Sequence, residues 1–535
     1  MLNEELRQAV KEAAKKLFDA DIEPELSRPD EKFGDYAANA ALQLAKKAPA
    51  SPRQIAEQLA GELKDAPGMQ EVTVAGPGFI NFRLTDEALA KAALFAANLP
   101  QSLAGQQILV EFGDPNPFKQ MHIGHLYSSV VGDAIVSLLK AYGADIKRLS
   151  YHGDVGLHVA KAIWGMRNDS GDIGAAYAAG AKAYEEGGSA KSEIDSINEH
   201  IYKRDDEQIN KLYDEGRSQS LVKFGQIYET LGIRYDKQYF ESESSAVGLK
   251  FVNANRQAFV QSQGALVYEG EKIGLHTRVF ITSKGLPTYE TKDLGLAVLK
   301  NQDYPQAARS IIITANEQTE YFRVMLAALA EIDPELAKKT THLAHGFVNL
   351  SSGKMSSRTG DVYSAEGLIN EVEQAAAQQF PESGQHNVTA LAALKYDFLK
   401  ARLGGDITFD IKESVSLEGN SGPYLQYAYA RAQSILAKSQ ASPELPGMKF
   451  DENERSLARK IGEYPQVVEK AASELMPHHV AVYLYELAQK FNNFYENSRI
   501  IGDERQALRL KLVNSYAQVL KSGLNVLNIE APEKM

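Results

Sequence analysis

Two histidines at the start of a predicted helix are the side chains best placed for chemistry. They belong to His122-Ile123-Gly124-His125, which follows an apolar run at residues 108–112 that is typical of a buried parallel strand. Backbone N–H groups and the helix dipole favour a phosphate at such a helix start. This histidine pattern arises by chance in roughly 2 of 100 chains of this composition. The segment therefore predicts a nucleotide site, with a chance pair of surface histidines as the alternative.

A second segment combines small side chains with two cations, in the order Gly353-Lys354-Met355-Ser356-Ser357-Arg358-Thr359-Gly360. Such a loop can close over a polyphosphate and offset the charge that develops when pyrophosphate departs. Alone, a segment of this kind is more often a solvated turn. The two segments in this order within one α/β region are far more specific than either.

The composition excludes several classes of site. At about 150 residues per domain, the 535 residues should form about three or four domains. The absence of cysteine excludes thiolate catalysis, disulfides and cysteine-bound zinc, and we expect no metal site built by the protein. Neither a secretory signal nor a run of about 18 apolar residues is present. We expect a cytoplasmic protein with no membrane partner.

The net charge of −12 arises wholly in the first three quarters of the chain. Residues 395–535 contain 18 basic and 18 acidic side chains, which leaves 40 basic and 52 acidic for residues 1–394. Phosphate binding needs clustered lysine and arginine, so this balance argues against indiscriminate nucleic-acid binding.

The elements that must position the histidines form an interrupted Rossmann-like core at residues 106–405. A helix from about Gly124 to Tyr142 follows the first strand, and apolar side chains recur along it at steps of four. Strand-like runs return at residues 276–282 and 309–315, each before a helical pattern. Residues 168–245 are polar and read as an inserted helical segment.

Two further parts flank this core. Residues 1–98 predict a small α+β module, because helical patterns at 1–20 and 53–64 precede two strands around Gly76-Pro77-Gly78. Residues 406–535 predict an all-helical domain. The fold class is thus multidomain α/β.

The two motifs closely resemble the His-Ile-Gly-His and Lys-Met-Ser-Lys-Ser signatures of class I aminoacyl-tRNA synthetases. The resemblance implies ATP with Mg²⁺, and in-line attack of an amino-acid carboxylate on the α-phosphate. It assigns transition-state stabilisation to His122 and His125, and close approach of adenine to Gly124. The remaining residues that it implies at the triphosphate are Lys354, Met355, Ser356, Ser357 and Arg358.

Within that class the chain resembles the arginyl enzymes along nearly its full length. The motifs that carry this resemblance are Glu111-Phe112, Asp114-Pro115-Asn116-Pro117, Pro287-Thr288-Tyr289-Glu290-Thr291-Lys292-Asp293, Leu417-Glu418-Gly419-Asn420, the run from Pro423 to Arg431 and the closing Ala531-Pro532-Glu533-Lys534-Met535. In the first module, Gly34-Asp35-Tyr36-Ala37 and Gly76-Pro77-Gly78-Phe79-Ile80-Asn81 resemble the N-terminal domain of that family.

The resemblance implies a set of residues around bound L-arginine, whose planar guanidinium suits carboxylates and carbonyls. These residues are Glu111, Asn116, His122, Tyr289, Asp293 and Gln318. Each has a simpler alternative: Asp293 can cap a helix and Tyr289 can pack in a strand.

Three departures from the family pattern are visible. Ser357 replaces the second lysine of the Lys-Met-Ser-Lys pattern, and the resemblance implies that Lys119, just before the histidines, compensates alongside Lys354. Tyr127 stands where the family usually has arginine. The family's Gly-Asp-Trp-Gly-Thr-Gln becomes the segment from Gly153 to His158.

For tRNA, the resemblance implies contacts of the first module with the elbow and of the helical domain with the anticodon. Candidate residues are Tyr424, Gln426, Tyr427, Tyr429 and Arg431, because exposed aromatics can stack on unpaired bases. Most aromatics of these helices should be core. The tetrapeptide that names the family's domain, Asp-Ala-Leu-Arg, has its nearest match in Gln506-Ala507-Leu508-Arg509.

We therefore expect an arginine–tRNA ligase, a monomer that binds L-arginine, ATP and tRNA(Arg), and needs tRNA before it activates arginine. A synthetase for another amino acid, a nucleotidyltransferase that binds no RNA and a silent RNA-binding paralogue are the alternatives. The lack of cysteine removes zinc-dependent synthetases, the helical domain has no purpose in a nucleotidyltransferase, and the intact histidines disfavour a silent protein.

Overall fold

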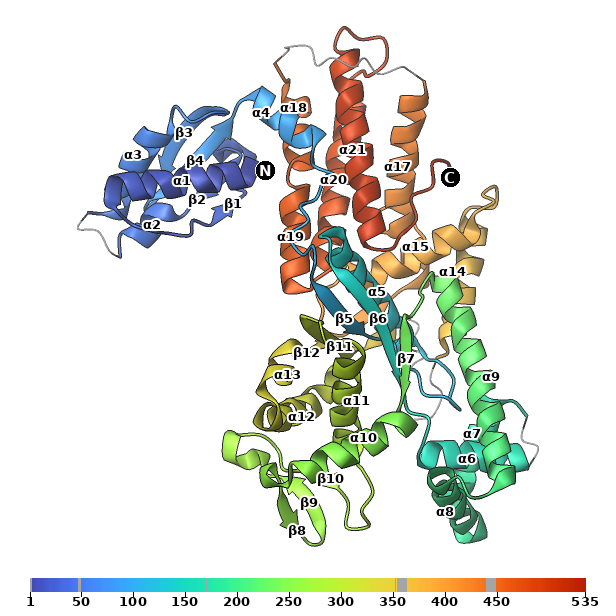
Figure 1. Ribbon diagram of the computed structural model, residues 1–535. Helices are drawn as coiled ribbons and strands as arrows, with labels where there is room; N and C mark the ends of the chain where they lie inside the picture. Colours follow the sequence, from blue (N-terminus) through green and yellow to red (C-terminus); the bar gives the residue numbers. More distant parts are fainter. Residues whose placement is uncertain (1, 47–49, 169–170, 352, 354–362, 439–448) are drawn as a thin grey trace.

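The computed structural model describes residues 2–46, 50–168, 171–351, 353, 363–438 and 449–535. Figure 1 shows an N-terminal module beside a bundle of C-terminal helices, with the α/β core below the bundle. No helix in these ranges combines the length and apolarity that crossing a membrane requires.

The N-terminal module is an antiparallel sheet packed against helices. Its strand order is β1-β2-β4-β3, and the hairpin predicted around Gly76-Pro77-Gly78 is confirmed. Side chains such as Ile55, Leu59 and Phe82 form its own buried core. The elements are α1 (Leu2–Phe18), β1 (Leu26–Ser27), β2 (Tyr36–Ala38), α2 (Ala40–Leu44), α3 (Pro52–Leu63), β3 (Met69–Ala75) and β4 (Phe79–Leu84).

A five-stranded parallel sheet forms the centre of the α/β core. Its order is β12-β11-β5-β6-β7, so the chain leaves β5 for β6 on one side and reaches β11 on the other. The carboxyl ends of strands at such a reversal form the usual ligand crevice. The predicted helix after β5 is confirmed as α5 (Ile123–Ala141). The strands are β5 (Gln107–Glu111), β6 (Asp145–His152), β7 (Lys237–Phe240), β11 (Arg309–Ala315) and β12 (Thr340–His345).

The inserted segment ends earlier than predicted. Its helices stop at Leu231, and Lys237–Phe240 is strand β7, paired in parallel with β6. Residues 237–240 form a strand because Tyr239 and Phe240 are buried there, although the surrounding sequence is polar. The helices are α6 (Leu157–Arg167), α7 (Ile173–Glu186), α8 (Gly188–Lys203), α9 (Glu207–Leu231) and, after β7, α10 (Glu241–Ala254).

The run at 276–282 forms a strand, but not one of the parallel sheet. Strand β10 (Arg278–Ile281) pairs antiparallel with β9 (Ala265–Tyr268), which pairs with β8 (Val260–Ser262). The sequence pattern predicts a strand without choosing its partner. The later elements are α11 (Tyr289–Asp303), α12 (Thr319–Ile332), α13 (Pro334–Lys339), β13 (Val348–Leu350), α14 (Ala365–Gln379), α15 (His386–Leu399), β14 (Ile407–Phe409) and α16 (Ile411–Ser414).

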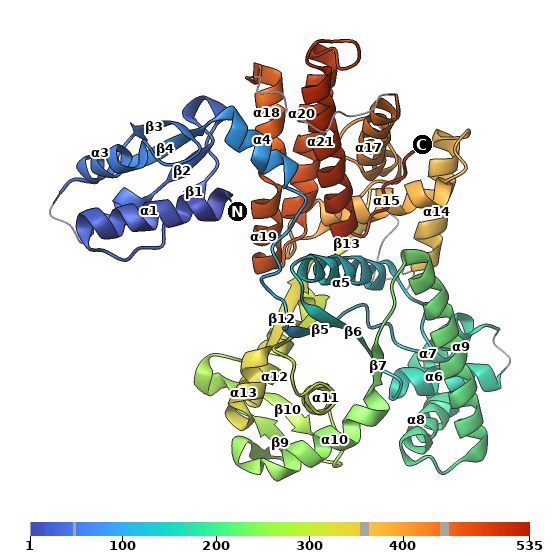
Figure 2. The ribbon, with the colours of Figure 1, turned by 45° about the horizontal axis from the view of Figure 1, so that its top comes forward.

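The C-terminal part is a helical bundle, as predicted, although β14 at its start is a short strand paired with β13. Residues 86–94, assigned to the first module, form helix α4 (Asp86–Leu94), which packs against α18 (Glu452–Ile461) and α21 (Gln506–Val526) of this bundle (Figure 2). Ala93 joins the bundle's core, whereas Leu89 joins that of the module. The bundle consists of α17 (Gly422–Ala437), α18 (Glu452–Ile461), α19 (Tyr464–Glu474), α20 (His478–Asn497) and α21 (Gln506–Val526).

A buried lysine joins three distant segments behind the sheet. Nζ of Lys395 donates to the carbonyl oxygens of Leu231 and Asn528, both at 2.8 Å. Asn528 follows α21, and its Nδ2 donates to the carbonyl of Asp133 in α5 at 3.1 Å. Arg148 of β6 donates to the carboxylate of Asp133 at 3.2 Å. The helix that begins at the histidine motif is thereby fixed to the end of the helical bundle.

Candidate active site

The two predicted histidines meet at the start of α5, beyond the carboxyl end of β5. Their ring centroids are 3.7 Å apart. His122 caps the helix: its Nδ1 accepts from Gly124 N at 3.1 Å, and Nδ1 of His125 accepts from His122 N at 3.3 Å. A Cβ at Gly124 would lie 3.0 Å from Cε1 of His122, so glycine keeps this arrangement free of a clash.

Both imidazoles are neutral hydrogen-bond donors. Burial lowers the pKa of His122 to about 4, with a further contribution from Lys119, and burial also holds the pKa of His125 well below its usual range. Because each Nδ1 accepts a backbone hydrogen bond, the proton of each neutral ring lies on Nε2. Two Nε2–H groups are thus available to a phosphate without any protonation step.

Residues just after the second predicted segment contact this helix start. Ile123 N donates to Tyr363 O at 3.0 Å, and His122 forms a bridge with Ser364. The predicted ATP-binding residues Lys354, Met355, Ser356, Ser357 and Arg358 lie outside the described residues. Lys119 stands with its Nζ 5.0 Å from the ring centroid of Tyr177 in α7, and its charge reaches both histidines.

Buried carboxyl groups cluster at the carboxyl ends of the neighbouring strands. Glu111 ends β5 and forms an ion pair with Lys300 at 2.8 Å, with both side chains buried. Burial and the charge of Glu111 raise the pKa of Asp114 well above its usual value. Asp293 of α11 accepts a hydrogen bond from Tyr321; burial, with Glu111 and Glu241 adding to it, raises the pKa of Asp293 to about 7. These carboxyl groups share one electrostatic environment.

Asn116 lies beside this cluster. Its Oδ1 accepts from Gly153 N at 2.9 Å, and a Cβ at Gly153 would lie 3.2 Å from Oε1 of Glu241. Asn116 and Glu241 therefore flank the same glycine. Glu241 itself is buried and paired with Lys292 at 2.6 Å.

Tyr289 and Asp293 occupy the first two turns of α11. Tyr289 is the first residue of this helix and its side chain is 64% exposed, so the alternative of strand packing is wrong. Thr288 holds the cap position, so capping by Asp293 is wrong as well. Gln318 is exposed in the turn between β11 and α12.

The sequence reading missed Glu241, Lys300 and Tyr321. Glu241 follows β7 directly, at the edge of the sheet where Glu111 and His152 end their strands. Assigning β7 as a strand would have pointed to Glu241. Lys300 and Tyr321 have no such signal. Lys300 is far along the chain from its partner Glu111, and Tyr321 comes from a different helix than its partner Asp293, so folding alone brings each pair together.

The loop from Gly153 to His158 is held by hydrogen bonds within itself and to the inserted helices. Nε2 of His158 lies 2.8 Å from Gly153 O, and burial lowers the pKa of His158 to about 4. Asp154 accepts hydrogen bonds from Tyr213 of α9 and from Ser242 of α10, both at 2.7 Å. The loop thus ties the inserted helices to the core. Tyr127 packs edge-on against His345 and Phe398.

Of the predicted RNA-contacting residues on α17, only some reach the surface. Tyr427 is 40% exposed, and Arg431 lies over the rings of Tyr427 and Tyr495 at 4.9 and 5.4 Å. Tyr424 is half-buried and accepts a hydrogen bond from Asn492. Tyr429 and Gln426 were predicted at the RNA surface, but both are buried because they face the core between α17 and the rest of the bundle.

Within the described ranges, no group of three or more histidine, aspartate or glutamate residues is arranged to hold a metal ion. The polar groups at the carboxyl ends of the strands are carboxyl groups and the ammonium groups paired with them, together with the two neutral imidazoles.

Comparison with known families covers almost the whole chain. Residues 3–84 match the arginyl tRNA synthetase N terminal domain, residues 87–396 the catalytic domain of tRNA synthetases class I (R), and residues 425–535 the DALR anticodon binding domain. The arginine–tRNA ligase of Lactobacillus delbrueckii subsp. bulgaricus is 31% identical, over 96% of each chain.

Two solved structures share the fold. The arginyl-tRNA synthetase of Thermus thermophilus has a TM-score of 0.86 and 28% identity, with 100% of each chain covered. That of Plasmodium falciparum has a TM-score of 0.83 and 20% identity, with 100% of this chain and 99% of the other covered. The second likeness bears on the fold alone.

Proposed function

Since this chain belongs to the arginyl-tRNA synthetases of class I and is an arginine–tRNA ligase, we propose how its residues divide the two steps of the reaction. In the first step the carboxylate of arginine attacks the α-phosphate of ATP, and pyrophosphate leaves. In the second, a hydroxyl of the terminal adenosine of tRNA attacks the carbonyl carbon of the adenylate, and AMP leaves.

Selection of arginine rests on one observation, the excess of buried carboxyl groups over cations in the crevice. Glu111, Asp114, Glu241 and Asp293 face two ammonium groups, those of Lys292 and Lys300. A guanidinium brings a fixed positive charge and planar donors to such a place. Asp293 and Asn116 would receive the substrate, with Glu111 and Gln318 beside it and Tyr289 over its open side.

Phosphoryl transfer falls to the start of α5. The Nε2–H groups of His122 and His125 donate to the α-phosphate oxygens as charge develops, and they need no reorganisation because backbone bonds already orient both rings. His122 would also contact the arginine carboxylate. Lys119 balances charge on the triphosphate together with Lys354. ATP would enter as its Mg²⁺ complex, as a substrate.

The remaining assignments concern tRNA and the state of the protein. Residues 1–98, 106–405 and 406–535 would serve as elbow-contacting, catalytic and anticodon-binding parts, with tRNA(Arg) as partner. Tyr424, Tyr427 and Arg431 would meet the anticodon loop, since base stacking on tyrosine is tolerant of sequence. The chain would act as a cytoplasmic monomer.

Aminoacylation of total tRNA with ATP, Mg²⁺ and each of the twenty amino acids, supplied separately, tests the selection. Arginine alone should be attached. Attachment of another amino acid would refute the assigned pocket. In addition, ATP–pyrophosphate exchange should need tRNA, and robust exchange with arginine alone would contradict that dependence.

A further inference from the structure

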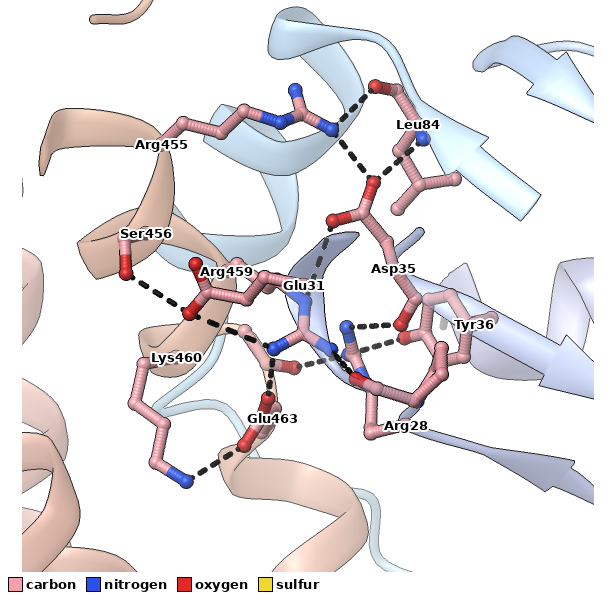
Figure 3. Close-up of polar contacts among 12 residues, drawn as sticks. Arg28, Glu31, Asp35, Tyr36, Leu84, Arg455, Ser456, Arg459, Lys460 and Glu463 are labelled. Atoms are coloured by element: carbon pink, nitrogen blue, oxygen red, sulfur yellow. Dashed lines mark hydrogen bonds and ion pairs between the residues drawn. The ribbon is translucent and has the colours of Figure 1, made fainter. Parts of the chain in front are cut away.

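Helix α18 carries opposite charges toward two neighbours. Glu454, in its first turn, accepts hydrogen bonds from Arg505 and from Arg509 of α21, and Asp451 caps the helix and pairs with Arg509 at 3.1 Å. The next residue, Arg455, and Arg459 one turn further on point to the N-terminal module (Figure 3). The helix is therefore held between the bundle and the module.

On the module side, Asp35 is the common partner of both arginines. Its carboxylate lies 2.7 Å from Nη2 of Arg455 and 3.5 Å from Nε of Arg459, and its side chain is 3% exposed. It also accepts from Leu84 N within the module at 2.7 Å. Arg459 further donates to Pro29 O at 2.6 Å. The carboxylate thus has partners on both sides of the joint (Figure 3).

The residues on either side of Asp35 are shaped for the same contact. Gly34 has φ of +125°, and a Cβ there would lie 2.8 Å from Phe82 O, so only glycine fits. The hydroxyl of Tyr36 accepts from Gln466 of α19 at 3.1 Å, and Arg28 stacks on the Tyr36 ring at 3.7 Å while donating to Gly462 O. Gly34-Asp35-Tyr36 therefore faces the bundle and not open solvent.

An outer set of contacts borders this centre. Glu31 accepts from Ser456 at 3.0 Å and from Lys490 of α20 at 2.9 Å. Apolar contact between the module and the bundle is made by α4 and Phe450, since Leu89 belongs to the module's core, Ala93 belongs to the bundle's core, and Phe450 borders both. A polar joint of this kind adds modest stability, but its directional bonds select one orientation.

We propose that Gly34-Asp35-Tyr36 is a docking element that holds the N-terminal module at one fixed spacing from the anticodon-binding helices, and that Asp35, Arg455 and Arg459 are positioning residues for tRNA. The proposal rests on the proposed function, because both parts must contact the tRNA. When one part of the protein has bound the tRNA, the other part meets it at a high effective concentration, provided that the two parts are held at the right spacing. Affinity for tRNA falls when that spacing is lost. Arg509, in the Gln506–Arg509 segment, secures the far side of α18.

The test is the KM for tRNA in full-length variants. Asp35→Asn keeps an acceptor for Leu84 N and removes the charge that binds both arginines, so we expect KM to rise about tenfold or more with kcat within about twofold. Arg455→Gln should do the same from the bundle side: it removes the guanidinium that binds Asp35, Asp86 and the carbonyl of Leu84, and leaves every side chain of the module in place. Glu335→Gln, in an exposed pair with Lys338 on α13, is the matched control and should leave the KM for tRNA unchanged.

The distance between the module and the bundle is measured independently, between dyes attached at Gln58→Cys and Lys521→Cys. Both sites are unique because the chain contains no cysteine. We expect a narrow distance distribution that broadens in Asp35→Asn. A KM within twofold of wild type in both interface variants overturns the positioning role, as does an unchanged distance distribution. A separate experiment tests the proposed function, that is, whether the module contacts tRNA at all. An iron chelate attached at Gln58→Cys in the otherwise wild-type chain should cleave bound tRNA, and no cleavage would mean that this contact is absent.

Discussion

Two buried charge clusters in this protein differ in their balance. In the crevice, burial raises the pKa of Asp114, Glu241 and Asp293, and the cations present leave carboxyl groups in excess. Along α18, burial pushes the pKa of Glu454 upward, but hydrogen bonds from Arg505 and Arg509 outweigh it and hold that pKa below its usual value. A balanced cluster stabilises architecture, whereas an unbalanced one is suited to a cationic ligand.

The largest expected effect comes from breaking the balanced cluster. Arg509→Met should lower the free energy of unfolding of the helical bundle by about 3–5 kcal/mol, because it leaves buried carboxylates short of a cation. Urea denaturation followed by circular dichroism measures this. The exposed Arg402→Met should stay within about 0.5 kcal/mol. A loss below about 1 kcal/mol for Arg509→Met would show that α18 is not held by charge.

A change in the unbalanced cluster of carboxyl groups should reduce activity and leave stability unchanged. Asp293→Asn should lower kcat/KM for arginine about 10- to 150-fold, through loss of a charge-assisted contact of about 1.5–3 kcal/mol. Its melting temperature should not fall, because the variant removes a carboxylate whose ionisation burial opposes. Aminoacylation kinetics and thermal unfolding of the same preparation give both values. A lower melting temperature with unchanged kinetics would make Asp293 structural.

The pH dependence sharpens the same contrast. Because the pKa of Asp293 is about 7, its carboxylate is progressively protonated below neutrality, and KM for arginine should rise by up to about tenfold per pH unit. The folded pKa lies above the unfolded value, so ionised Asp293 destabilises the fold above pH 7, and this cost disappears as pH falls toward 4. KM measured from pH 6 to 8 should be flat in Asp293→Asn; parallel curves would exclude Asp293 as the titrating group.

The smallest expected effect concerns the histidines. With the pKa of His122 at about 4 and that of His125 also lowered, both rings stay neutral, and kcat at saturating arginine should change less than about twofold between pH 6 and 8. A fall of kcat with a midpoint near pH 6.5 would mean that a histidine with an ordinary pKa takes part.

Local pattern was enough to place the two histidines at the start of a helix. A strand, a turn and a helix around His122 are separated by few residues, so periodicity alone positioned the histidines correctly. The hairpin around Gly76-Pro77-Gly78 followed from the same kind of evidence.

The features that the sequence did not predict depend on residues that lie far apart along the chain. Strand β10 was recognised, yet its antiparallel partners were not, and β7 was hidden in a polar stretch. Lys300 meets Glu111 from 189 residues away, a pairing that no local spacing encodes. Tyr429 and Tyr427 are two residues apart on one helix, and only the packed bundle decides which is buried.

The Lys395 junction bears on the order in which the protein is made. Its ammonium group needs carbonyl oxygens from Leu231 and Asn528, and Asn528 in turn holds Asp133. A ribosome releases the catalytic segments long before residue 528. During synthesis the buried lysine therefore lacks one of its two carbonyl partners until the last helix has emerged and Asn528 has docked.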